Sequence, residues 1–353
     1  MPQDLPQQSR TVSSVQDARA WMQTLARYRE PNGARSIFEI VITVVPLVLL
    51  WAVILIAVHF GHWYALVLII PAAGFMVRLF MIQHDCGHGS FFRGKQANDW
   101  VGRIIGIFTL TPYDFWRQTH AVHHAHSGNL ELRGMGDIET YTVSEYLDMP
   151  RWRRLFYRIY RNPLFLFAIG PAYLFFLQYR LPVGMMWSNG WRPWASTMAT
   201  NAGIAFVVGL MIWLTGFQSF LLVYLPIVLL AASIGVWLFY VQHQFEDTWW
   251  AKRENWNHQQ AALHGSSYYD LPAVLRWFSA NIGIHHVHHL SSKIPFYRLS
   301  NVLNDFPELK KIGRITLTES FCTVRLTLWD EIERRLISFR EFRERYGSVS
   351  QPA

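Results

Sequence analysis

The sequence predicts an all-α integral membrane protein with four transmembrane helices in two hairpins and a cytoplasmic helical cap. Three observations support this fold class. The 353 residues are 51% apolar and 16% aromatic, which is high for a soluble domain of this length. The apolar residues are bunched into runs long enough to cross a bilayer. Two long windows, residues 36–77 and 193–251, contain no lysine or arginine, as expected of hairpins whose turns face away from the cytoplasm.

The N-terminal segment, residues 1–36, is polar and has no apolar core followed by a cleavage site, which a signal peptide would have. Within it, Val15–Tyr28 has a weak amphipathic period. We therefore expect this stretch to lie at the membrane surface.

The first hairpin is predicted to contain transmembrane helices at about residues 37–60 and 63–83. At 1.5 Å per residue, each apolar run is long enough for a bilayer core, whereas a buried helix of a soluble protein would need only about 10–14 apolar residues. Glu39 is the single acidic or basic residue of the first run, and Arg78 is that of the second.

Two shorter apolar stretches follow in the central segment. Trp100–Tyr113 is too short to span, and we interpret it as an interfacial or re-entrant piece. The stretch at residues 162–180 is interrupted by Pro163, Gly170 and Pro171, which break helices. Neither stretch is therefore expected to be a transmembrane helix.

The second hairpin occupies residues 195–243, with helices predicted at about 195–215 and 218–243 and a turn near Gly216. No Asp, Glu, Lys or Arg occurs from Ala195 to Gln244. These limits divide the chain into three parts: a cytoplasmic N-terminal segment (1–36), a membrane domain (37–310) and a cytoplasmic helical tail (311–353). The tail is expected to be helical because Leu326–Tyr346 is rich in Arg and Glu.

The basic residues predict the orientation. Lys and Arg accumulate on the cytoplasmic side, so the N-terminus, the central segment and the C-terminus are expected to be cytoplasmic, as in a bacterial inner membrane. The net charge of +8 fits contact with an anionic leaflet.

Nucleic-acid binding is not expected, because no basic stripe or known motif supports it. Cys86 and Cys322 give no disulfide framework and fit a reducing compartment. Arg117 and one arginine cluster could contact an anionic partner near the interface, although the positive-inside bias is the favoured explanation for most of them. The cluster is Arg151, Arg153, Arg154, Arg158 and Arg161.

The chain contains a repeated histidine triplet. Each copy places three imidazoles at positions i, i+3 and i+4, which is one face of a helix. A further pair at i and i+4 precedes them. The motifs are His84-Asp-Cys-Gly-His88, His120-Ala-Val-His123-His124 and His285-His286-Val-His288-His289.

In the predicted topology, all three motifs lie at the same level, at the cytoplasmic ends of the transmembrane helices. His243 closes the fourth helix at that same level and is the natural ninth ligand. Imidazole is the commonest metal-binding side chain, and eight or nine ligands are too many for one ion. Dividing them gives four or five per metal, which suggests a dinuclear site.

The metal itself is not determined by these residues. Imidazole suits Zn, Cu, Fe and Ni alike. A single zinc site would need three or four ligands, and copper usually recruits Cys or Met. The Glu-x-x-His motif of soluble di-iron bundles is missing. The residues alone therefore indicate two redox-active transition metals and no more.

The three motifs resemble the three histidine boxes of membrane fatty acid desaturases. The likeness extends over residues 40 to 300 and includes Asn162-Pro163, Gly170-Pro171 and the end of the fourth helix at Val241-Gln-His243. The surroundings of His243 depart from the usual His-rich version of that segment. The spelling His-Asp-Cys-Gly-His resembles the acyl-lipid Δ12 or ω-6 branch more than the acyl-CoA Δ9 branch.

The resemblance implies a centre of two iron ions (Fe²⁺/Fe³⁺) that uses O₂ and two electrons to place a cis double bond in a lipid-linked acyl chain. It implies a membrane lipid as substrate and an external electron donor such as ferredoxin or cytochrome b5. No His-Pro-Gly-Gly haem signature or flavin-type Gly-x-Gly-x-x-Gly motif occurs in these residues, so we expect electrons to arrive from a separate partner.

The resemblance implies no catalytic residue beyond the metal ligands. The family's ligands carry over residue by residue onto His84, His88, His120, His123, His124, His285, His288 and His289, with His243 as the ninth. Asn281 is a candidate for holding a metal-bound water or orienting a ligand, with a helix-cap role as the alternative. Asp85, Asp137 and Glu139 are candidate acceptors for ring N–H groups. Phe75, Trp237 and Phe239 are candidates for lining an apolar tunnel, although such residues more often serve plain packing.

Two other functions remain open at this point. A hydroxylase or ketolase acting on an acyl chain or carotenoid would use the same histidine boxes. A metal transporter or sensor would use the histidines as transit ligands, but it should carry polar ligands at mid-membrane depth. The predicted histidines gather at the cytoplasmic edge, which counts against a transporter.

Overall fold

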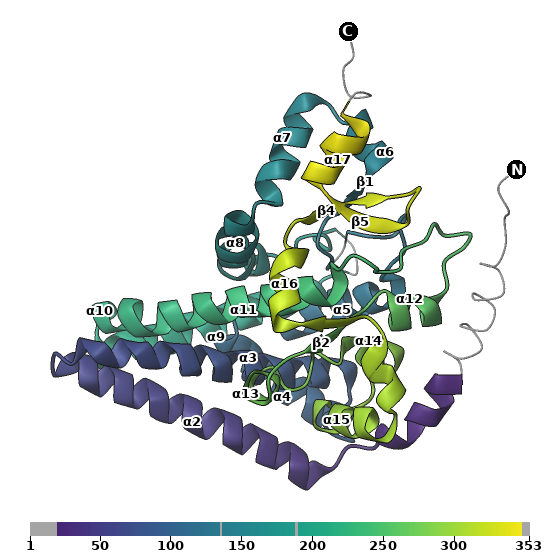
Figure 1. Ribbon diagram of the computed structural model, residues 1–353. Coiled ribbons are helices and arrows are strands. Elements are labelled where there is room, and N and C mark those ends of the chain that lie inside the picture. Colours follow the sequence, from purple (N-terminus) through teal and green to yellow (C-terminus); the bar gives the residue numbers. More distant parts are fainter. Residues whose placement is uncertain (1–19, 135, 188–189, 348–353) are drawn as a thin grey trace, which may run out of the picture.

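Four long helices dominate the computed structural model, which describes residues 20–134, 136–187 and 190–347 (Figure 1). Each is long and apolar enough to cross a membrane, and they lie side by side. They are α2 (Gly33–His59); η2 (Trp63–Leu68) continued by α3 (Ile69–His88); α9 (Arg192–Thr215); and α10 (Phe217–Ser219) continued by η5 (Phe220–Tyr224) and α11 (Leu225–His243). The predicted fold class, a helical membrane protein with four spans, is confirmed.

The ends of the first two spans are set by local capping rather than by hydropathy. Helix α2 begins at Gly33, before the predicted start, because the Asn32 side chain accepts a hydrogen bond from the backbone N–H of Arg35. Helix α3 continues past residue 83 to His88 and stops at Gly89, which adopts φ +64°. This extra turn makes His84 and His88 part of one helix.

The lone charges of the first two predicted spans form a buried ion pair. Arg78 of α3 pairs with Glu39 of α2, and the two side chains are 3% and 1% exposed. Arg78 also donates to the carbonyl of Trp277, and its guanidinium lies over the Trp277 ring. The pair therefore ties the first hairpin to the segment that precedes the last histidine box.

The central segment is built from short helices. Trp100–Tyr113 is not one element, because α4 (Lys95–Phe108) ends there, Leu110 takes a positive φ of 55°, and α5 (Tyr113–His126) begins after Pro112. A Cβ on Gly102 would lie 2.2 Å from the Tyr113 ring, so glycine lets α4 and α5 pack closely. The stretch interrupted by Gly and Pro forms η3 (Phe165–Ile169, a π-helix), α8 (Gly170–Phe176) and η4 (Gln178–Arg180).

The segment after α11 packs on the ends of the long helices. Its elements are α12 (His258–His264), β2 (Tyr268–Asp270), α13 (Ala273–Phe278), α14 (His285–Leu290), α15 (Phe296–Asp305), η6 (Pro307–Lys311), β3 (Arg314–Thr316) and α16 (Leu317–Thr323). Strands β2 and β3 pair in parallel. The described part of Val15–Tyr28 ends in η1 (Leu25–Tyr28), whose Tyr28 hydroxyl bonds Asp305 of α15; residues 15–19 lie outside the described residues.

The prediction of a helical stretch at Leu326–Tyr346 is wrong for its first part. Strands β4 (Leu326–Asp330) and β5 (Arg335–Ser338) form an antiparallel hairpin, and only α17 (Phe339–Tyr346) is helical. The charged residues misled the prediction: Arg335 pairs with three glutamates that lie outside β4 and β5, namely Glu246, Glu333 and Glu341. Leu328, Leu336 and Ile337 of the hairpin are buried.

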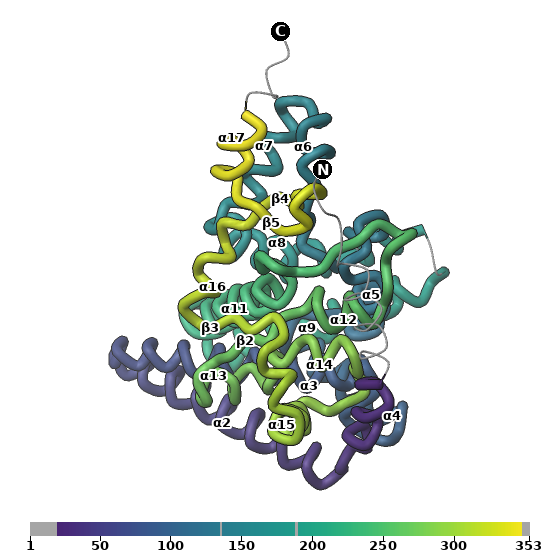
Figure 2. The backbone as a smooth tube through the Cα atoms, turned by 45° about the vertical axis from the view of Figure 1, so that its right-hand side comes forward, coloured from purple at the N-terminus to yellow at the C-terminus, as the bar shows by residue number. Residues whose placement is uncertain are grey.

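This hairpin belongs to a small packed unit. Strand β1 (Tyr141–Thr142) pairs in parallel with β4. Helices α6 (Val143–Asp148), α7 (Arg151–Tyr160) and α17 share one apolar cluster with the hairpin. Figures 1 and 2 both place the unit at one end of the molecule, away from α2.

Candidate metal centre

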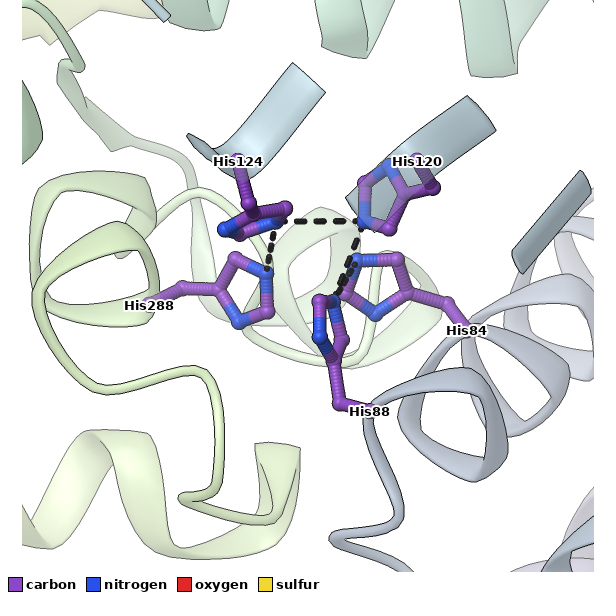
Figure 3. Close-up of side chains that lie close together, drawn as sticks. All are labelled: His84, His88, His120, His124 and His288. Carbon is purple, nitrogen blue, oxygen red and sulfur yellow. Dashed lines mark hydrogen bonds between the residues drawn. The ribbon is translucent and has the colours of Figure 1, made fainter. Parts of the chain in front are cut away.

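Nine imidazoles converge in two groups beside the ends of the long helices. The first group takes two histidines from α3, two from α5 and one from α14, and the second takes one from α5, one from the end of α11 and two from α14. Within each group the ligand atoms all lie within 4.8 Å of one another. The first group is His84, His88, His120, His124 and His288 (Figure 3), and the second is His123, His243, His285 and His289.

The helix period explains how each triplet serves both groups. Residues i and i+4 project from nearly the same side of a helix, and residue i+3 projects from the adjacent side. On α5, His120 and His124 enter the first group and His123 enters the second. On α14 the assignment is reversed, since His288 alone joins the first group.

The distances between ring nitrogens fit ligands that surround one ion. In the first group the Nε2 atoms of His88 and His120 are 3.0 Å apart, and those of His124 and His288 are 3.2 Å apart. In the second group His243 Nε2 lies 3.1 Å from that of His123 and 3.0 Å from that of His285. Nitrogens held about 2.1 Å from one metal are separated by roughly 3.0–3.4 Å in octahedral or tetrahedral arrangements.

The protonation of these rings also suits metal binding. Burial lowers the pKa of the histidines on α5 and α14 well below the usual value, because it disfavours the charged form. Nearby imidazoles lower it further. The neutral ring that results is the form that binds metals. The residues concerned are His120, His124, His285, His288 and His289.

Two carboxylates hold rings from the side opposite the centre. Asp137 Oδ1 lies 2.5 Å from His123 Nδ1. The pKa of Asp137 lies below its usual value. Burial alone would raise this pKa, but the charge and the hydrogen bond of the neighbouring His123 lower it by more. Asp85 Oδ1 lies 3.3 Å from His84 Nδ1, and its Oδ2 accepts from the Phe296 N–H at 2.7 Å. Each carboxylate favours a proton on Nδ1, which leaves the Nε2 lone pair aimed at the centre.

The other two candidates make different contacts. Asn281 adopts φ +57°, donates to the Phe296 carbonyl and accepts from Ser300, so its described bonds shape the turn before α14. Glu139 accepts from the Tyr141 hydroxyl. Neither side chain has a described hydrogen bond to a histidine of the two groups.

A large apolar cavity opens beside both groups. Its volume is about 790 Å³, and His84, His120 and His285 form part of its wall. The remaining wall comes mainly from α3, α5, α8 and α11, with a smaller part from η3. Cavities of this size hold a drug-sized or lipid-sized apolar molecule.

The aromatic residues that line the cavity are only partly those expected from the sequence. Phe239 lines the cavity, but Phe75 packs on Trp277 and Phe278 and Trp237 packs on Phe167 and Phe321. Sequence reasoning missed the aromatic residues of the segment broken by Gly and Pro: Phe165, Tyr173, Phe175 and Tyr179. It also missed the small residues Ala231, Ala232 and Gly235 on α11, whose spacing could have indicated a cavity-facing stripe.

Fold and site together define an integral membrane protein with two histidine groups that could each hold a metal ion, beside a large apolar cavity. The fatty acid desaturase family model matches residues 61–314. The chain is 42% identical to a fatty acid desaturase of Bacillus subtilis, over 90% of this chain and 89% of that protein. This chain belongs to the fatty acid desaturase family, and it is an oxidoreductase.

Two relatives from Synechocystis are more distant. One, named an sn-1 acyl-lipid omega-3 desaturase (ferredoxin), is 29% identical over 63% of this chain and 61% of that protein. The other, named an sn-1 oleoyl-lipid 12-desaturase, is 28% identical over 62% of each chain. The names of these three relatives give the hydroxylase interpretation no support.

Proposed function

We propose that this protein places a cis double bond in the acyl chain of a membrane lipid, using O₂ and two electrons at a centre of two iron ions. The observation that carries the proposal is that both histidine groups reach one apolar cavity, through His84 and His120 on one side and His285 on the other. A methylene chain offers no polar handle, so it must be aimed by a shaped apolar wall rather than by hydrogen bonds.

The donor sets fit two metals. Five imidazoles would hold one iron and four the other, in the groups described above. When bound, the irons supply the oxidising power that an unactivated C–H bond requires. Everything else in the reaction falls to the protein, which must orient the ligands, keep water out and position the acyl chain.

The chain's own residues are suited to these tasks. Asp85 and Asp137 fix the ring orientation of His84 and His123 from outside the centre. The cavity wall is largely apolar and aromatic, so an acyl chain that fills it would exclude water next to the histidines. The depth and bend of the cavity would determine which methylenes lie beside the metals.

The position of the double bond is proposed as Δ12 or ω-6, because the first histidine box has the sequence His-Asp-Cys-Gly-His. The Synechocystis relative named an oleoyl-lipid 12-desaturase supports this position, and the relative named an omega-3 desaturase points to a neighbouring one. Both names refer to acyl lipids, which supports a lipid-linked substrate. The ferredoxin in one name supports a separate iron–sulfur donor, with cytochrome b5 as the other donor predicted above.

We further propose that the centre and both termini face the cytoplasm of a bacterial inner membrane. The support is the distribution of Lys and Arg, which are absent from residues 36–77 and 193–251.

One experiment tests the reaction and its position together. The chain is expressed in a host whose lipids contain only saturated and monounsaturated acyl chains, and the fatty acids are analysed by mass spectrometry. A new diene with its second bond at Δ12 is expected. A hydroxy or keto product would refute desaturation, and a diene with the bond elsewhere would refute only the position.

A pair of matched variants tests the centre. His123→Ala removes a ring from the second group and should abolish the product. His126→Ala removes a ring from the same helix that lies outside both groups, and it should leave the product unchanged. If the His123 variant retained full activity, the assigned centre would be wrong.

A further inference from the structure

Helix α7 has an exposed apolar face that the reaction proposed above does not use. Trp152, Leu155, Phe156 and Ile159 occupy positions i, i+3, i+4 and i+7, which form one stripe along the helix. Each is between 46% and 64% exposed. A stripe of this kind on a helix of ten residues requires an apolar partner.

The opposite face of α7 is already occupied. Tyr157 is buried in the apolar cluster shared with β4, and its hydroxyl donates to the Thr327 carbonyl. Arg154 and Arg158 are also engaged by the chain, since they donate to the Met149 carbonyl and to the Tyr146 hydroxyl. The helix is therefore held by one side, and its outer side is left exposed.

The charge on α7 favours an anionic partner. The helix contains four arginines and no acidic residue. Arg151 and Arg153 are exposed and flank the apolar stripe, and the Arg153 guanidinium lies over the Trp152 ring. An apolar stripe flanked by arginines is the pattern of helices that lie in the headgroup region of a membrane.

The placement of α7 supports the same partner. Figures 1 and 2 both show it running crosswise to the four long helices, as a helix in the membrane plane would. Its last residue, Tyr160, lines the cavity, as does Phe165 in the next element. The exposed apolar surface continues along η3 and α8 through Leu164, Ile169, Tyr173 and Leu177.

We propose that α7 is an interfacial anchor, with its apolar stripe in the bilayer and Arg151 and Arg153 at anionic lipid headgroups. The anchor holds the cavity wall formed by Tyr160 and Phe165 at the membrane surface. The proposal depends on the membrane-spanning helices and not on the reaction, so either proposal can fail without the other.

Site-directed fluorescence on the full chain in lipid vesicles tests the anchor. Cys322, the exposed cysteine, is changed to Ser, and Cys86 is left because it is buried. Phe156→Cys then carries an environment-sensitive dye on the stripe. Ile332→Cys carries it on the β4–β5 turn, where the side chain is 82% exposed, as the matched control. The Cys322→Ser protein alone should take up no dye.

The dye at residue 156 is expected to lose emission with nitroxide-labelled lipids and to resist iodide in the water. The dye at residue 332 is expected to be quenched by iodide and to keep its emission with nitroxide-labelled lipids. Iodide quenching at both positions alike would overturn the proposal. Protection from both quenchers at residue 156 would also overturn it, because it would mean that a second copy or another protein covers the stripe.

A charge reversal tests the lipid preference. Quenching at residue 156 is expected to be stronger in vesicles that contain phosphatidylglycerol than in pure phosphatidylcholine, since each arginine near an anionic surface strengthens binding about fivefold. The double variant Arg151→Glu/Arg153→Glu should lose this difference. A difference that persists unchanged would overturn the assignment of these arginines to headgroups.

Discussion

A leucine at position 235 should shorten the longest acyl chain that the protein accepts. Gly235 lies on α11 and forms part of the cavity wall. A Cβ on Gly235 would meet no heavy atom within 4 Å, so a larger side chain can extend into the cavity without moving the helix. The residue is eight positions before His243, which at 1.5 Å per residue is about 12 Å along the helix. The substitution therefore narrows the cavity two turns away from the centre and removes no histidine.

The size of the effect follows from the volume exchanged. Leucine adds four carbon atoms to glycine, so it displaces about four methylenes of a bound chain. Each buried methylene contributes about 0.8 kcal/mol, so a chain that fills the whole cavity loses about 3 kcal/mol of binding free energy. That corresponds to a decrease in kcat/KM of roughly 100-fold. The kcat/KM for an acyl chain shorter by about four methylenes should be unaffected. Gly235→Ala should shorten the longest accepted acyl chain by about one methylene.

The assay is the conversion of a mixture of acyl chains that differ in length, measured by mass spectrometry in the same cells. Gly209→Leu is the matched control, because Gly209 also lies in a long apolar helix with open space around its Cβ but is exposed and outside the cavity wall. An unchanged length profile for Gly235→Leu, or the same shift for Gly209→Leu, would refute the reasoning. Metal content of the purified variants confirms that the centre remains intact.

Three further predictions concern the centre and the buried ion pair. His123→Ala should abolish product and lower the bound metal measured by elemental analysis, whereas His126→Ala should change neither; equal metal content in the two would contradict the second group. Asp137→Asn should weaken metal affinity or activity by about 10–100-fold, because the carboxylate that orients His123 is lost; full metal binding at limiting iron would contradict this. Glu39→Ala should destabilise the protein by about 3–5 kcal/mol, seen as a lower melting temperature, because it leaves the charge of Arg78 buried and unpaired. Adding Arg78→Met should recover part of that loss, and no recovery would mean that the bond from Arg78 to Trp277 dominates.

The four spans could be predicted because membrane crossing depends on the length and composition of a run, both of which are visible in the sequence. Their ends could not, because they depend on single side chains. Asn32 caps α2 earlier than hydropathy indicates, and Gly89 ends α3 later. The β4–β5 hairpin was missed for a related reason. The strands of this hairpin are stabilised by partners distant in sequence, such as β1, and its arginines and glutamates resembled those of an exposed helix.

The histidines could be predicted as a cluster because the spacing of each triplet is a local property of a helix. Their division into two groups could not be predicted, since it depends on how α5 and α14 face each other. The cavity wall was also beyond the sequence. A π-helix and a short α-helix form part of this wall where Pro163, Gly170 and Pro171 indicated only an interruption. Phe165 and Tyr173 could therefore not be assigned to the wall from the sequence.

The interleaving of the two triplets makes the centre one unit rather than two adjacent sites. Because α5 and α14 each contribute to both groups, neither helix can shift without disturbing ligands on both sides. His123 and His288 are the crossing residues, since each is the single member of its triplet that joins the other group. The cavity reaches both groups through histidines from α3, α5 and α14. An acyl chain bound in the cavity would therefore lie against histidines of both groups, as the reaction proposed above requires.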